Sequence, residues 1–70
     1  MEPSNPDLRG WTVTAEQEHE LAVLKEKHGV AFVNEVYGDG GAQIVTQDAE
    51  DDRQHIYEVE QDGTTKELRS

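Results

Sequence analysis

The segment from Thr14 to Gly29, TAEQEHELAVLKEKHG, carries a complete set of local signals for one α-helix. Thr14 can act as the N-cap, and Gln17, three residues later, can complete a capping box. Glutamates occupy the first half of the segment, and two lysines and a histidine occupy its last turn, as the helix macrodipole favours. Gly29 then provides the left-handed residue at which helices commonly stop. The sequence therefore predicts a helix between Thr14 and Gly29.

This helix has a single narrow apolar face. Leu21, Leu24 and His28 follow the spacing i, i+3 and i+7, which aligns them on one side. A helix of about four turns is only marginally stable alone in water, so its apolar face must pack on another surface. That surface must come from residues 30–70, because the segment before the helix contains two prolines and no apolar run.

The rest of the chain is typical of short strands separated by turns. Apolar and β-branched residues alternate with polar ones, and glycine-rich or Asp-Gly turns interrupt them. We expect an α+β fold, in which one amphipathic helix packs on a four-stranded antiparallel β-meander. Residues 1–10 are expected to form a flexible N-terminal arm, and residues 11–70 a single small domain. The strands are predicted at 30–37, 42–47, 55–61 and 64–68.

The register of the first hairpin depends on the length of its GDGG turn. A loop of only Asp39 and Gly40 would mismatch the faces of the two strands. We therefore expect a loop one residue longer, with a bulge at a glycine, which places Val36 opposite Ile44. Phe32 would then lie on the same side as Val36.

The second hairpin is expected to turn at Asp62-Gly63 with a two-residue type I′ turn. This register places Tyr57 opposite Leu68 and Val59 opposite Lys66 on the core side. It also pairs Glu58 with Glu67, which is unfavourable unless salt screens the two charges. The predicted core is Leu21, Leu24, Phe32, Val36, Ile44, Tyr57, Val59 and Leu68.

The second face of the sheet is expected to carry a small apolar strip. Its members are Val33, Val45 and Ile56, on an otherwise acidic surface. Small cores with a second apolar face often use it for self-association, so we expect a homodimer. We consider two roles for Trp11: it covers one end of the core, or it is an exposed anchor for another protein. The candidate interaction residues are thus Trp11, Val33, Val45 and Ile56.

The composition limits the environment of the protein. The chain of 70 residues has sixteen acidic residues and six Lys and Arg, and its net charge is −10. Direct binding to nucleic acid is therefore not expected. There is no cysteine, and hence no disulfide or thiolate metal site. The sequence shows neither a signal peptide nor an apolar stretch of about 20 residues, so we expect a cytoplasmic protein without membrane contact.

The three histidines do not form a metal motif in the sequence. His19-Glu20 begins like the zinc-protease signature H-E-x-x-H, but Val23 occupies the position of the second ligand. His19 and His28 would project from opposite sides of the helix. We interpret His28 as a residue at the core boundary or at the C-terminal helix dipole, with a ligand role as the less favoured alternative. His55 has no partner in the sequence and is expected to be solvated or hydrogen-bonded.

The acidic loop after residue 47 resembles a calcium loop only superficially. Asp48, Glu50 and Asp52 have the alternate spacing of such a loop. However, Arg53 stands where the loop needs glycine and Val59 where it needs the bidentate Glu, so an EF-hand is excluded. A solvated loop is the interpretation we prefer, with a weak adventitious cation site among its acids as the alternative.

No catalytic motif is present either. No serine lies in a G-x-S-x-G setting, and a domain of this size has difficulty enclosing a usual small-molecule pocket. We expect no enzyme, no cofactor, and no catalytic or metal-binding residues. The preferred hypothesis is a non-catalytic interaction or self-associating module adapted to high salt. The alternatives are an acidic DNA mimic that inhibits a nucleic-acid-binding protein, and a transcription-associated winged-helix-like module.

Overall fold

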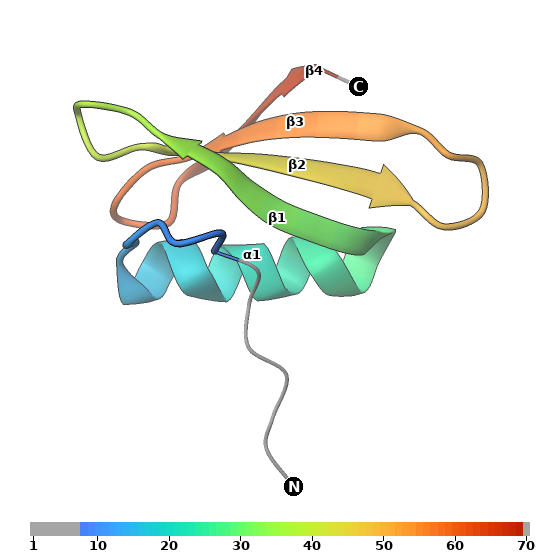
Figure 1. The fold of residues 1–70 in the computed structure, drawn as a ribbon, viewed down its shortest axis with the longest axis horizontal. Helices are drawn as coiled ribbons and strands as arrows, with labels where there is room; N and C mark the ends of the chain where they lie inside the picture. The colour runs from blue at the N-terminus through green and yellow to red at the C-terminus, as the bar shows by residue number, and fades with distance from the viewer. Residues whose placement is uncertain (1–7, 70) are drawn as a thin grey trace, which may run out of the picture.

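A computed structural model of the protein describes residues 8–69. Each strand in this range is antiparallel to the next, and the strands lie in the sheet in the order in which they occur in the chain. The helix packs against one face of the sheet, mainly on its first two strands (Figure 1). The predicted fold class, α+β with a four-stranded meander, is confirmed. The elements are α1 (Ala15–His28), β1 (Gly29–Val36), β2 (Ala42–Asp48), β3 (Gln54–Val59) and β4 (Thr65–Arg69).

Both ends of α1 follow the local signals in the sequence. The Thr14 hydroxyl accepts a hydrogen bond from the Gln17 N–H at 3.2 Å, and the Gln17 Oε1 accepts one from the Thr14 N–H at 2.8 Å. At the other end Gly29 has a φ of 101°, which L side chains rarely adopt. Gly29 is also the first residue of β1, so the chain passes from helix to strand without a loop.

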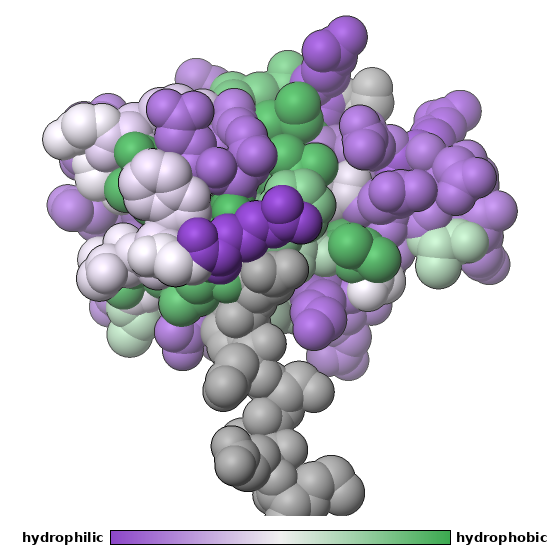
Figure 2. Space-filling view, in the orientation of Figure 1, coloured by the Kyte–Doolittle hydropathy of each residue, from purple (hydrophilic) through white to green (hydrophobic). Residues whose placement is uncertain are grey.

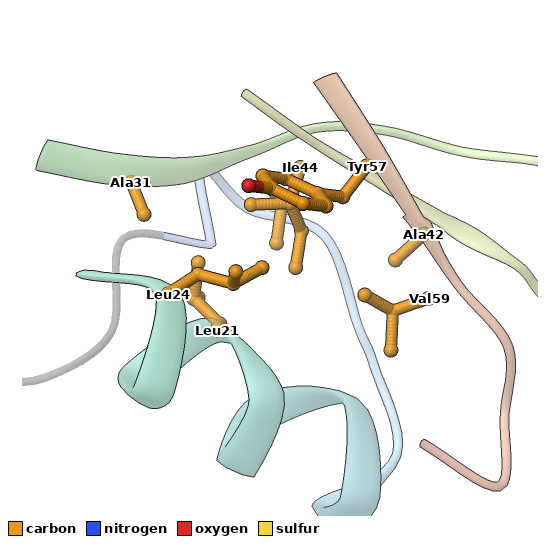
Figure 3. Close-up of a cluster of buried hydrophobic side chains, with 8 residues drawn as sticks. Leu21, Leu24, Ala31, Ala42, Ile44, Tyr57 and Val59 are labelled. Atoms are coloured by element: carbon orange, nitrogen blue, oxygen red, sulfur yellow. The ribbon is translucent and has the colours of Figure 1, made fainter. Parts of the chain in front are cut away.

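The core lies between α1 and the side of the sheet that faces it. The Tyr57 side chain lies in this layer beside Ile44 (Figure 3). Phe32 and Leu68 were predicted to belong to the core, and this was wrong: Phe32 is half-buried on the opposite face, and Leu68 is 46% exposed. Val36 only packs against the core from its margin. The core residues are Leu21, Leu24, Ala31, Val33, Ala42, Ile44, Tyr57 and Val59.

A β-bulge in β1 explains the error at Phe32. The pairing of β1 with β2 shifts at Asn34, between Val33 opposite Ile44 and Glu35 opposite Gln43. A bulge adds one residue to a strand and so breaks the period of two on which the prediction relied. As a result, Val33 turns towards the helix and Phe32 away from it.

The first hairpin has a loop of the expected length in a different place. The Tyr37 N–H donates to the Gly41 carbonyl at 2.7 Å, and the Gly40 N–H donates to the Tyr37 carbonyl at 3.0 Å. Gly40, the last residue of this three-residue loop, has a φ of 94°, as expected for the left-handed glycine of such a loop. Val36 therefore pairs with Ala42, and the predicted pairing of Val36 with Ile44 was wrong.

The second hairpin also differs from the prediction. Glu60 and Thr64 close a three-residue loop, in which Gly63 has a φ of 93°, so the turn is not a two-residue type I′ turn. Val59 then lies opposite Thr65, and Glu58 opposite Lys66. The predicted pair of Glu58 and Glu67 does not form. Repulsion between these two carboxylates is therefore no longer a reason to expect that the protein needs salt for stability.

One buried polar residue connects the helix start to both hairpins. Gln17 is 2% exposed. Its Nε2 donates to the carbonyl of Gly40 at 2.7 Å and to that of Val59 at 3.0 Å, while its Oε1 accepts from Thr14. The Thr14 hydroxyl in turn donates to the Gln61 carbonyl at 2.7 Å. The N-terminal end of α1 is therefore fixed by polar contacts as well as by packing.

The residues that precede the helix contact the domain. Leu8 packs against the core cluster, and the Arg9 guanidinium lies 3.9 Å from the centroid of the Phe32 ring. Trp11 is 40% exposed. Residues 1–7 of the predicted flexible arm lie outside the described residues.

Candidate functional site

A group of polar side chains gathers at the C-terminal end of α1. His28 belongs to the same helix face as Leu21 and Leu24, so its ring is buried against the sheet. The His28 Nδ1 contacts the carboxylate of Asp48, the last residue of β2. The His28 Nε2 lies 2.9 Å from the hydroxyl of Tyr57 on β3. Both nitrogens of this imidazole therefore have a partner from the sheet.

A second histidine reaches the same carboxylate from β3. His55 precedes Tyr57 by two residues and shares its face of the sheet. Its Nε2 lies 3.4 Å from the second oxygen of Asp48, and its Nδ1 lies 2.9 Å from a carboxylate oxygen of Glu67 on β4. The centroids of the two imidazole rings, of His28 and His55, are 4.7 Å apart. We refer to His28, Asp48 and His55 as the His-Asp-His cluster.

Hydrogen bonds and nearby charges shift the pKa values of Asp48 and His55 in opposite directions. The hydrogen bond with His28 holds the pKa of Asp48 below its ordinary value of 3.8. The hydrogen bond with Glu67 raises the pKa of His55 above its ordinary value of 6.5, and Asp48 adds to this effect. Folding therefore favours the carboxylate form of Asp48 and the protonated form of His55 relative to the unfolded chain.

A shallow hollow of about 460 Å³ adjoins the cluster. His28 and Asp48 contribute to its wall, so small ions have a path to both side chains. The rest of the wall consists of small or charged residues. Its other lining residues are Glu26, Lys27, Gly29, Ala49, Glu50 and Asp51.

The arrangement has one superficial likeness to a catalytic triad. Tyr57, His28 and Asp48 form a chain from hydroxyl to imidazole to carboxylate, as in nucleophile, base and orienting group. However, Tyr57 is 7% exposed, and burial raises its pKa above the ordinary value of 10.0. A buried tyrosine whose ionisation is disfavoured is a poor nucleophile. The His-Asp-His cluster is better suited to hold a metal ion, since His28, Asp48 and His55 offer ligand atoms that all lie within 4.8 Å of one another.

Sequence reasoning did not find this cluster. From the sequence alone, His28 is interpreted as a residue at the core boundary or at the C-terminal helix dipole rather than as a ligand, and His55 has no partner. The connection depends on the register of β2 with β3, which pairs Thr46 with His55 and leaves Asp48 beside them. The sequence does contain one indication of this contact. His28 is the last residue on the apolar face of the helix, and this face packs on the sheet.

The candidate interaction residues lie in different places. Val45 and Ile56 are half-buried on the face of the sheet away from α1, as expected from their alternation with the buried Ile44 and Tyr57. Val33 is 1% exposed and belongs to the core, so its assignment to the open face was wrong. Trp11 is exposed, and its role as an anchor stays a prediction.

No known family model matches this chain, and neither curated proteins nor solved structures show a significant similarity to it. Among residues 8–69, no helix is long and apolar enough to cross a membrane.

The raised pKa of His55 leads to a prediction about pH. A group whose pKa is raised by folding stabilises the protein below its unfolded pKa, and this contribution is lost as pH rises through the folded pKa. In metal-free buffer we expect an NMR titration to place the pKa of His55 above 6.5. Glu67→Gln should lower this pKa, because it removes the charge of the main partner. A His55 pKa that does not respond to Glu67→Gln would contradict the assignment.

Proposed function

We propose that the protein is a non-catalytic module of the cytosol that self-associates through the open face of its sheet. The observation that supports this proposal is a row of three apolar side chains on neighbouring strands: Phe32 pairs with Val45, and Val45 pairs with Ile56. All three are only half-buried. Such a row, on a face that α1 leaves uncovered (Figure 1), has the composition of an interface centre.

The charges around this row favour a second copy as the partner. The outward positions of the strands hold two acidic and two basic residues, and the Arg9 guanidinium adds a positive charge over the Phe32 ring. The whole chain, in contrast, has sixteen acidic residues and six Lys and Arg. Two copies can therefore meet here without bringing many carboxylates together. The balanced residues are Glu35, Glu58, Lys66 and Arg69.

The distribution of these charges also suits a two-fold axis. Glu35 lies on the edge strand β1, and Lys66 lies on the other edge strand, β4, in the same cross-strand row. An axis parallel to the strands, between β2 and β3, would place β1 of one copy over β4 of the other. Glu35 would then face Lys66, and Val45 would face Ile56, which gives an isologous interface.

Adaptation to high salt is part of the same proposal. Acidic residues occur on the helix, on the strands and in the loops, and Figure 2 shows hydrophilic residues over much of the visible surface. At 1 M salt the Debye length is about 3 Å, which screens repulsion between such charges. Carboxylates that occur on all parts of the domain are better explained by contact with salty solvent than by one ligand.

Sedimentation in concentrated KCl tests the proposal. The wild-type protein should form a dimer, and Val45→Glu should weaken it by about 30-fold or more, as for a residue at the centre of an interface. Gln54→Glu is the matched control, because it adds the same charge on the same face outside the apolar row. Circular dichroism should show that both variants remain folded. A wild-type protein that stays monomeric at all concentrations would overturn the proposal.

A further inference from the structure

The His-Asp-His cluster has the ligand types and distances of a metal site. His28 offers Nδ1, His55 offers Nε2 and Asp48 offers a carboxylate oxygen, all within 4.8 Å of one another. Metal–ligand bonds of about 2.0–2.2 Å in a tetrahedral site separate ligand atoms by roughly 3.4 Å. The distance between the His55 Nε2 and the Asp48 Oδ2 is already 3.4 Å. Only small side-chain rotations would bring all three atoms to these separations.

In each histidine, the ring nitrogen that faces away from Asp48 has a hydrogen-bonding partner, as is usual for metal-ligating histidines. A metal-ligating histidine usually binds a carboxylate, a carbonyl or a similar partner through its other nitrogen, which fixes the orientation of the ring. Here Tyr57 holds the Nε2 of His28 at 2.9 Å, and Glu67 holds the Nδ1 of His55 at 2.9 Å. The two inner nitrogens therefore both point at Asp48.

We propose that His28, Asp48 and His55 bind a divalent transition-metal ion of the zinc type. Two imidazoles and one carboxylate suit such an ion, whereas Mg²⁺ and Ca²⁺ prefer oxygen ligands alone. The hollow beside His28 and Asp48 gives the ion access and leaves a coordination position for water. The ion would connect α1, β2 and β3, and so stabilise a domain that has no disulfide. This inference does not depend on self-association.

Titration calorimetry with ZnCl₂ on protein treated with EDTA tests the proposal. One ion per chain should bind, and ZnCl₂ at 100 times its dissociation constant should raise the melting temperature by about 10–20 °C. His55→Ala should weaken binding by about 100-fold, and Glu67→Ala by about 10–100-fold, as is usual for outer partners. His19→Ala is the matched control, because His19 is an exposed helix residue outside the cluster. It should leave zinc binding unchanged.

A second measurement avoids substitutions altogether. In an NMR titration of the wild-type protein with ZnCl₂, the Nδ1 of His28 and the Nε2 of His55 should shift, and the nitrogens of His19 should not. The absence of zinc binding would overturn the proposal. Equal binding by His55→Ala, or displacement of zinc by an equal concentration of CaCl₂, would also overturn it, because the acidic residues after β2 would then be the site.

Discussion

Gln17→Ala is expected to lower the free energy of unfolding by about 3–5 kcal/mol, since it leaves buried backbone groups without partners. The wild-type side chain donates to the carbonyls of Gly40 and Val59 and accepts from the N–H of Thr14. Alanine makes none of these bonds and leaves a cavity at a position that is 2% exposed. The loss is comparable to the whole stability expected for a domain of this size.

Urea denaturation followed by circular dichroism measures this effect. Glu18→Ala, at the neighbouring exposed position, is the control and should change the free energy of unfolding by less than about 0.5 kcal/mol. Gln17→Glu separates the donor role from the volume of the side chain. Its second oxygen would face the carbonyls of Gly40 and Val59, so we expect a loss at least as large as that of alanine near neutral pH. A stable Gln17→Glu protein would show that the two carbonyl contacts contribute little.

Ile44→Ala is expected to cost about 2–5 kcal/mol, as for a fully buried aliphatic residue. Ile44 is 0% exposed in β2, and it lies between its cross-strand partners Val33 and Tyr57, which are also buried. Neighbours on both sides limit the collapse of the cavity. Val23→Ala, at a helix position that is 45% exposed, removes apolar volume outside the core and should be close to neutral.

The midpoint of urea denaturation again provides the measurement. A decrease in the midpoint without a change in slope would show that Ile44→Ala lowers stability while the unfolded state stays the same. If Ile44→Ala and Val23→Ala had equal effects, the core would not lie between α1 and the sheet as described.

Short-range sequence signals predicted the structure correctly where it depends on contacts between residues close in sequence. The capping box of Thr14 and Gln17 and the stop at Gly29 appear as predicted, since both use hydrogen bonds and dihedral angles within a few residues. Alternation also placed Ile44, Tyr57 and Val59 correctly in the core. It failed at Phe32 and Leu68, because a register shift occurs near each of them.

The His-Asp-His cluster illustrates a second limit. His28, Asp48 and His55 come from three separate elements, and each has an ordinary explanation when it is considered alone. Their contact requires both the register of β2 with β3 and the direct passage from α1 to β1 at Gly29. Neither the pairing partner of a strand residue nor the position of a bulge is encoded in a short window.

The sequence by itself determined the helix, its two ends, the number and order of the strands and the α+β class, because these follow from short-range hydrogen bonding and from the period of apolar residues. Only the tertiary structure decided the hairpin registers, the exchange of Phe32 for Val33 in the core, and the meeting of His28 with His55. A bulge shifts every later pairing in its hairpin, and its position depends on how side chains fit between α1 and the sheet.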